Sequence, residues 1–367
     1  MPCGSAEEQV LAREGLDLYS LFAAPDASGY VSVCLIPLLC FYSVGAYDWL
    51  RHRGDAEAYP FLEENAGRVR RARAVLKGVG SGGVDNLASE LAAAHDASVA
   101  AFRGSHRGVL APLKRWIQPD LGVFYVGENL VGSTHVALRG FPFTPDEIRR
   151  LDSTGYFALG PILRGFSTEL GSFIGGILGR VGEDRAPLTP CTSNIVASAE
   201  DHKADRFFRL VASSIGVESP TVAAAVVAIV ANHNLLGIVV PNTLQTSLAF
   251  RMRFLTWFHS VVSLKKVAAH VKGGGSSRLG ALLSDVMRQP GSRQVCKWKA
   301  LRNSLAHYDH AMPAGFQGDV LDFTCRDRTG ATLDEVDAQA TEENRALSMA
   351  FRELVSRGRF GGARVPT

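Results

Sequence analysis

Apolar side chains recur every three or four residues from Leu244 to Val271, which is the repeat of an α-helix. Because this repeat continues over such a long stretch, it restricts the fold to one built around a buried helix. The residues on the apolar face are Phe250, Phe254, Trp257, Val261, Leu264, Val267 and Ala268. Lysines and a histidine follow between residues 265 and 272, before glycines 273–275, and cations are favourable at the C-terminal end of a helix. The pattern predicts one amphipathic helix over 244–271.

Three further segments complete a predicted C-terminal bundle. A helix over 278–289 stops at Pro290, and the next helix begins near Ser292. Its apolar face carries Val295, Trp298, Leu301 and Leu305. Residues 320–325, with a turn at 327–330, are typical of a short β-hairpin, and a final helix is expected over 333–355. Residues 241–367 are thus expected to form a four-to-five-helix bundle with a short hairpin insertion.

The preceding 240 residues also have mainly helical patterns. Helices are predicted over 68–77 and 84–102, separated by a glycine-rich break at 78–83, and a short hairpin is predicted within 122–143, with strands at 123–126 and 135–138. Thr144 to Glu147 has the residue types of a helix-starting capping box. Residues 185–198 are expected to form a loop. The fold class is therefore mainly α.

A chain of 367 residues exceeds the size at which one hydrophobic core usually stops growing. We therefore expect two domains, a mostly helical domain over 1–240 and the bundle over 241–367. The role of the first is unknown, with a sensory or regulatory role as the candidate. The boundary is placed at the change of pattern near Pro241.

Composition narrows the class of protein. Hydrophobic residues make up 46% and charged residues 20%, which favours a folded, soluble chain. The six cysteines include no CxxC pair and no Cys/His cluster at metal-ligand spacing, so a reduced, cytoplasmic protein with no bound metal or cofactor is expected. The net charge of +3 does not by itself indicate a nucleic-acid partner, because phosphate binding depends on local clusters.

Two stretches approach the length of a membrane span. Residues 27–47 carry no charge, and residues 220–240 carry only His233 as a titratable group. Pro37 in the first, and Asn232 and Asn234 in the second, are costly in lipid without partners. We therefore expect buried helices and no stable membrane association, with a membrane-associated effector anchored by 27–47 as the alternative.

One short motif near the end of the predicted third helix indicates chemistry. Arg302 and Asn303 are followed by His307, within Leu301-Arg302-Asn303-Ser304-Leu305-Ala306-His307-Tyr308-Asp309. An Arg, usually followed by a polar residue, and a His four to six residues later define the HEPN superfamily, and the last third of the chain resembles HEPN domains of bacterial abortive-infection and toxin proteins. A second match, Arg253 to His259, lacks the polar residue and is interpreted as a coincidence in a core helix.

The resemblance implies a metal-independent endoribonuclease. RNA supplies its own nucleophile, the 2′-hydroxyl, so cleavage needs only a proton-transfer group and a cation beside the phosphate. His307 suits proton transfer because its ordinary pKa lies near neutrality, and Arg302 suits the phosphate because its planar fork donates two hydrogen bonds. Asn303 would orient the phosphate or His307.

The same resemblance implies partners and a setting. HEPN domains commonly pair their motif helices across a dimer, so a homodimer is expected, in bacterial toxin or antiphage defence, with an antitoxin or a phage-derived trigger as a further partner. The RNA itself is expected to bind Tyr308, beside the motif, and a basic segment that carries Arg68, Arg70, Arg71, Arg73 and Lys77.

Plainer interpretations compete with each of these. Asn303 and His307 can satisfy polar groups inside the bundle while Arg302 pairs with Asp309, and a basic helix is often a solvated face. A non-catalytic HEPN module that binds RNA, a nucleotide or a partner protein is therefore the main alternative to the nuclease. Elsewhere, His233 is expected to be a hydrogen-bonded core residue, and His95 and His202 are expected to lie at the surface beside acids.

Overall fold

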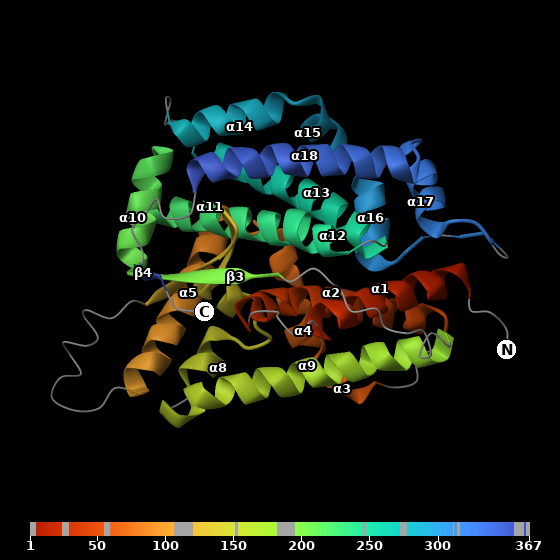
Figure 1. The fold of residues 1–367 in the computed structure, drawn as a ribbon, viewed down its shortest axis with the longest axis horizontal. Helices are drawn as coiled ribbons and strands as arrows, with labels where there is room; N and C mark the ends of the chain where they lie inside the picture. Colours follow the sequence, from red (N-terminus) through yellow and green to blue (C-terminus); the bar gives the residue numbers. More distant parts are fainter. Residues whose placement is uncertain are drawn as a thin grey trace.

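The computed structural model describes residues 5–23, 29–54, 59–105, 120–150, 153–181, 195–244, 247–271, 277–310, 312–313, 316–355 and 363–364. Within them the fold is mainly α-helical, with a small antiparallel sheet at one end of the molecule (Figure 1). This confirms the predicted fold class.

The first half of the chain supplies helices that lie beside the sheet and in the lower part of the molecule in Figure 1. They are α1 (Ala6–Ala23), α2 (Gly29–His52), α3 (Pro60–Glu64), α4 (Ala66–Ala74) with a 3₁₀ turn η1 (Val75–Lys77), α5 (Gly83–Ser105), α7 (Thr134–Arg139), α8 (Pro145–Arg149) and α9 (Ser153–Val181). The predicted helix over 68–77 and the glycine break after it are confirmed. Thr144 forms the predicted capping box with Glu147 at the start of α8.

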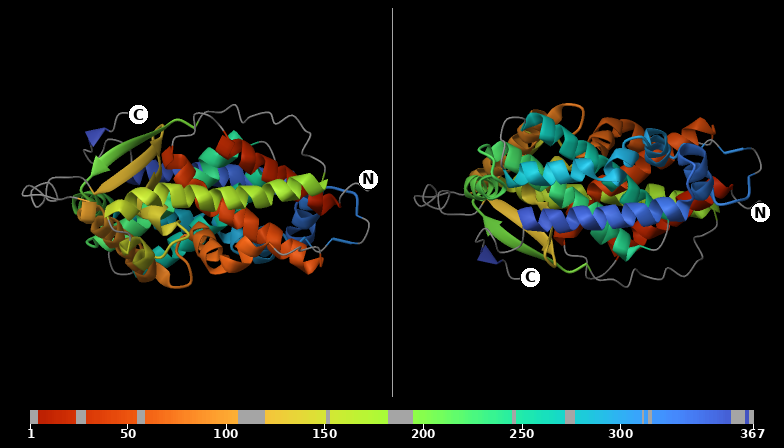
Figure 2. Two further views of the ribbon diagram at one scale, coloured as in Figure 1. Left: turned by 90° about the horizontal axis from the view of Figure 1, so that it is seen from below. Right: turned by 90° about the horizontal axis from the view of Figure 1, so that it is seen from above.

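The second half supplies the central and upper helices. They are α10 (Ala204–Ile215), α11 (Pro220–His233), the π-helical turn η3 (Asn234–Val239), α12 (Val240–Thr243), α13 (Ser247–His270), α14 (Arg278–Arg288), α15 (Pro290–Val295), α16 (Lys299–His307), α17 (Val320–Thr329) and α18 (Leu333–Leu354). Helix α9 crosses one face of the molecule and α18 the opposite face (Figure 2). Between them, α13 packs against α11, α12 and α18.

Helix α13 confirms the long helix predicted from the apolar period, but it is not amphipathic. Its buried residues lie on nearly every side and include the charged Arg251. The expected boundary near residue 240 falls within the continuous helical run of α11, η3 and α12, and buried residues before and after it belong to one hydrophobic core. The core is therefore shared across the predicted boundary.

The sheet has the strand order β2-β1-β3-β4, and all of its pairs are antiparallel. Its strands are β1 (Leu121–Val126), β2 (Asn129–Ser133), β3 (Ala197–His202) and the two-residue β4 (Ala363–Arg364). The predicted hairpin exists, but its second strand was wrongly placed. Residues 135–138 lie in α7, which begins where the Ser133 hydroxyl accepts a hydrogen bond from the Val136 N–H.

Two predictions in the C-terminal part are also wrong. Residues 320–329 form helix α17 rather than a hairpin, because Asp319 caps its first turn and Gly330 ends it in a left-handed conformation. The single helix expected from Ser292 is two helices, α15 and α16, with Trp298 as the N-cap residue of α16. The predicted loop over 185–198 lies mostly outside the described residues, and β3 begins within its end.

The described residues of the two apolar stretches lie in helices that are long and apolar enough to cross a membrane by length and composition. The apolar window is 78% buried in Val31–His52 and 83% buried in Pro220–Thr243. Burial of this extent also fits core helices of a water-soluble fold. His233 is fully buried, as predicted, and its ring nitrogens lie 2.9 Å from Ser260 Oγ and 3.0 Å from the Asn344 carbonyl oxygen.

Candidate functional site

Helix α16 carries the Arg–His motif and is anchored by its apolar side. Leu301 and Leu305 are fully buried, which turns the opposite side of the helix outward. The helix ends at Tyr308, which has a φ of 55°. Among the residues that the structure describes, Tyr308 alone adopts the left-handed conformation without being a glycine. His307 is therefore the last helical residue, at the surface of the molecule.

The three motif side chains lie close together at this surface. Asn303 and His307, one turn apart, are both exposed, and Arg302 is half-buried between α16 and α13. The guanidinium of Arg302 lies 5.5 Å from the centre of the Phe258 ring, and its Nη1 donates to Asn303 Oδ1 at 2.8 Å. The Nε of Arg302 is buried and has no acceptor among the described residues. The alternative in which Arg302 pairs with Asp309 is not what the structure shows.

Two members of the predicted basic segment reach the motif from more than 220 residues away in the sequence. Arg73 Nη2 donates to the Ala306 carbonyl oxygen at 2.5 Å and lies 3.4 Å from His307 Nδ1. The Arg73 guanidinium lies 5.4 Å from the centre of the Phe41 ring, which fixes its direction. Lys77, one turn further along, lines the same pocket.

The other predicted RNA-binding residues do not join this cluster. Arg68 is paired with Glu147 at 2.7 Å, and Arg70 lies 4.0 Å from Asp48. Arg71 is exposed on α4 but does not line the pocket.

The structure contradicts the prediction that Tyr308 contacts RNA. Its side chain is 2% exposed, and its hydroxyl donates to Glu14 Oε2 at 2.6 Å. The Arg251 guanidinium covers its ring at 4.0 Å, and Gly45 lies against the ring so closely that a Cβ there would collide with it. Tyr308 is therefore a buried anchor for the end of α16.

His259 lines the motif pocket, although the second Arg–His match that contains it was interpreted as a coincidence in a core helix. It belongs to the second Arg–His match, whose arginine, Arg253, points elsewhere and pairs with Asp337 at 2.6 Å. His259 instead lines the same pocket as Arg302 and His307. The second match was therefore a coincidence as a motif, although its histidine belongs to the site.

These side chains line one small pocket between α2, α4, η1, η3, α13 and α16. Its lining residues are Phe41, Arg73, Leu76, Lys77, Leu236, Met252, Leu255, Thr256, His259, Arg302, Ala306 and His307. The cavity volume is about 30 Å³, which is close to the volume of one water molecule. The pocket can thus admit part of a phosphoryl group, but it is too small for a base.

The pocket is strongly cationic. Burial and the neighbouring Arg302 lower the pKa of Lys77, and burial together with Arg73, Arg302 and Lys77 lowers the pKa of His307 below its ordinary value. Burial and Arg302 lower the pKa of His259 to about 3, which keeps that imidazole neutral at physiological pH. Asp48 opposes this lowering at His307 and also acts on Arg73, but no ion pair joins Arg73, Lys77 or Arg302 to a carboxylate among the described residues. Cations held together in this way favour an anionic ligand.

No protein-family model, curated protein or solved structure matches the chain. The function is therefore argued from the geometry of this pocket and from the motif. Within the part of the chain that the structure describes, no three His, Cys, Asp or Glu side chains are arranged to hold a metal ion.

His95 and His202 were expected at the surface beside acids, and the structure corrects both expectations. His95 Nδ1 lies 2.7 Å from Nε2 of the buried His135, and both line a second pocket. His202 is 7% exposed and lies 3.7 Å from the buried Glu200 on the same strand. The contact between His95 and His135 joins residues 40 positions apart in the sequence, so a local pattern could not show it.

Proposed function

We propose that the protein is an endoribonuclease in which His307 accepts the proton of the RNA 2′-hydroxyl while Arg302, Arg73 and Lys77 hold the phosphate. The observation that carries the proposal is the convergence of three cations from two distant segments on the exposed imidazole of His307. Holding like charges together costs free energy that an anionic ligand recovers, and a phosphodiester supplies both the anion and the adjacent hydroxyl.

The proposed reaction needs one proton acceptor and a preorganised set of cations. His307 takes the 2′-hydroxyl proton, O2′ bonds to phosphorus, and the bond from phosphorus to O5′ breaks. A solvent proton completes the 5′-hydroxyl, and the other product carries a 2′,3′-cyclic phosphate. The lowered pKa of His307 keeps the imidazole neutral, and thus able to accept a proton, at neutral pH.

The other groups of the pocket have supporting roles in this proposal. Arg302 and Arg73 stabilise charge on the phosphoryl oxygens through their guanidinium groups. The exposed Asn303 orients Arg302 through its amide oxygen. The neutral His259 can hydrogen-bond to the phosphate but does not serve as an acid. The bases of the RNA must lie outside the pocket, across the exposed surface of α16 and α4.

The decisive experiment incubates the purified chain with 5′-labelled single-stranded RNA in EDTA. We expect cleavage products that end in 2′,3′-cyclic phosphate, identified by mass spectrometry. Loss of a general base or of a phosphate-binding arginine should lower the cleavage rate about 100- to 10,000-fold in His307→Ala and Arg302→Ala. His52→Ala and Arg288→Ala remove an exposed histidine and an exposed arginine outside the pocket and should cleave at the wild-type rate.

A second function is favoured by the same cationic pocket. A non-catalytic module would bind RNA through Arg73, Lys77 and Arg302 without cutting it. In that case the wild-type chain would bind labelled RNA but leave it intact in EDTA, and His307→Ala would bind as tightly as wild type. By the HEPN resemblance we further propose a setting in bacterial toxin or antiphage defence, with a homodimer and a trigger or antitoxin as partners.

A further inference from the structure

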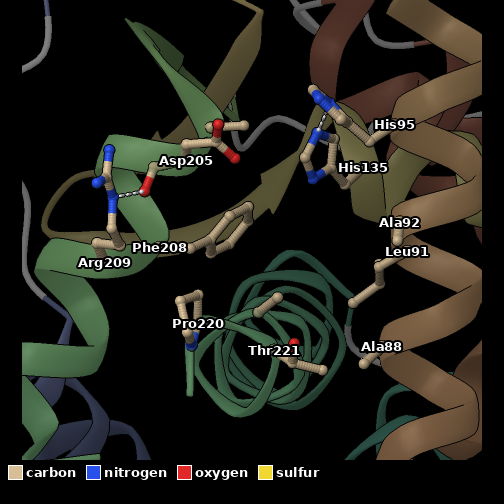
Figure 3. Close-up of a pocket in the computed structure, with 12 residues that line it drawn as sticks. Ala88, Leu91, Ala92, His95, His135, Asp205, Phe208, Arg209, Pro220 and Thr221 are labelled. Atoms are coloured by element: carbon tan, nitrogen blue, oxygen red, sulfur yellow. Dashed lines mark hydrogen bonds between the residues drawn. The ribbon is translucent and has the colours of Figure 1, made fainter. Parts of the chain in front are cut away.

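A second, larger pocket lies at the N-terminal end of α11, and all of its lining residues fall within 88–224 (Figure 3). Its lining residues are Ala88, Leu91, Ala92, His95, His135, Ala204, Asp205, Phe208, Arg209, Pro220, Thr221 and Ala224. The cavity volume is about 470 Å³, within the range of sites for small molecules. Its size indicates a compact ligand rather than a chain of RNA or protein.

The walls of this pocket fit a flat apolar body. Ala88, Leu91 and Ala92 of α5 form one side, and the ring of Phe208 on α10 faces them across the opening in Figure 3. The His135 ring stacks on Phe208 at 30° and 5.6 Å between centroids, which extends the aromatic wall. The small aliphatic groups of α5 lie opposite the Phe208 ring, and His135 borders the space between them because it contacts both Phe208 and His95 of α5. A planar ligand ring in this space can stack on Phe208.

The polar groups of the pocket specify hydrogen bonds along the edge of such a ring. His95 and His135 share a hydrogen bond through one ring nitrogen each, which leaves the second ring nitrogen of each histidine to hydrogen-bond to a ligand. Burial and His95 lower the pKa of His135 to about 3, which keeps it neutral. Asp205 at the rim has only acceptors, so a ligand that it binds must carry N–H or O–H groups.

The charges of this pocket differ from those of the motif pocket. Its one carboxylate, Asp205, is offset by one guanidinium, that of Arg209. No cluster of cations is present among its lining residues to favour a phosphate. The size and shape of the pocket, its hydrogen-bonding groups and its charge therefore all favour an uncharged heteroaromatic ligand.

We propose that this pocket binds a planar heteroaromatic ligand of nucleoside size, whose N–H edge faces Asp205 and whose ring stacks on Phe208. A purine nucleoside with two adjacent N–H donors on one edge, as in guanosine, has the chemistry that Asp205 recognises through both carboxylate oxygens. The proposal concerns binding at this pocket alone and does not depend on RNA cleavage by the motif pocket.

The test is isothermal titration calorimetry of the full chain with guanosine, inosine and adenosine. We expect saturable binding of guanosine, and binding of inosine weaker by about tenfold because it lacks one of the two donors. Adenosine should bind more weakly still. The absence of saturable binding for all three nucleosides would overturn the proposal.

Three variants test whether guanosine binds in this pocket. Ala92 is exposed at its rim, so Ala92→Trp should block the slot and abolish guanosine binding without disturbing the core. Ala100→Trp, the same change at an exposed position of the same helix outside the pocket, should bind as wild type. Asp205→Asn should weaken guanosine binding about tenfold to a hundredfold and reduce the preference over inosine. Guanosine binding that survives Ala92→Trp, or that is lost in Arg302→Ala instead, would place the ligand elsewhere and refute the assignment.

Discussion

His307 is exposed to solvent, yet its surroundings differ from those of an ordinary surface histidine. Arg73 lies 3.4 Å from its Nδ1, and Arg302 and Lys77 line the same pocket. Each of these cations disfavours the imidazolium, as does partial burial, so the pKa of His307 lies below its ordinary value. In the proposed reaction the neutral imidazole of His307 is the active form of the general base, so the cations would extend cleavage toward lower pH.

The cations therefore predict a shift in the pH profile of cleavage. The acidic limb of kcat/KM should lie below the ordinary histidine pKa of about 6.5 in the wild-type protein. Lys77→Gln removes one positive charge, raises the pKa of His307 and should move this limb to higher pH. The measurement is kcat/KM from pH 4 to pH 9, with Lys297→Gln, an exposed lysine outside the pocket, as the control. A limb that stays in place or moves to lower pH in Lys77→Gln would show that Lys77 does not act on His307.

Sequence alone found part of this site. The motif located Arg302, Asn303 and His307, and the local density of charge located Arg73 and Lys77, but nothing in the sequence showed that these two groups meet. Their contact depends on α2, α4 and α16 packing together, which is a long-range property. Tyr308 was misjudged because an aromatic residue beside a motif can be a stacking surface or a core anchor, and only burial distinguishes the two.

At the scale of elements, the end of α16 is held by a buried ion pair between α1 and α13. The side chains of Arg251 and Glu14 are both 0% exposed and lie 3.0 Å apart. Arg251 also donates to the Leu305 carbonyl oxygen, and Glu14 accepts from the Tyr308 hydroxyl. This network satisfies the C-terminal turn of α16 and thereby fixes the position of His307.

Removing the charge of one partner of this pair should lower the free energy of unfolding. Glu14→Gln leaves the Arg251 guanidinium buried without its counter-charge, and the free energy of unfolding should fall by about 3–5 kcal/mol. Asp337→Asn makes the same change in the partly exposed pair with Arg253 and should cost about 1 kcal/mol or less. Urea denaturation followed by circular dichroism measures both. Equal losses in the two variants would contradict the structural role assigned to the buried pair.

The elements that sequence patterns misassigned share a physical cause. Residues 320–325 combine β-branched and aromatic side chains, which favour strands, yet the capping of Asp319 and the burial of Val320, Leu321 and Cys325 stabilise a helix. Long periodic segments were predicted well, since α13, α14 and α18 lie within a few residues of their expected bounds. Short segments depend on caps and on tertiary packing, which a local pattern does not contain.

At the scale of the whole molecule, the buried residues form one core that joins the region before residue 240 to the region after it. The motif pocket itself draws Phe41, Arg73 and Lys77 from the first region, and His259, Arg302 and His307 from the second. The residues that resemble HEPN domains therefore do not form the site alone. One chain supplies three cations and two histidines, whereas the resemblance implies a composite site across a homodimer.

These two arrangements predict different behaviour in a mixed complex. Arg302→Ala and His307→Ala chains with different affinity tags are co-expressed, and any complex is isolated on both tags in turn. If each chain holds a complete site, the mixed complex should cleave RNA no faster than the two variants measured separately, because each chain lacks one essential group. Failure to recover any mixed complex would show that the chains do not associate, which also leaves the site within one chain. Cleavage restored toward the wild-type rate would instead show that arginine and histidine from different chains act on one phosphate, and the one-chain site would have to be given up.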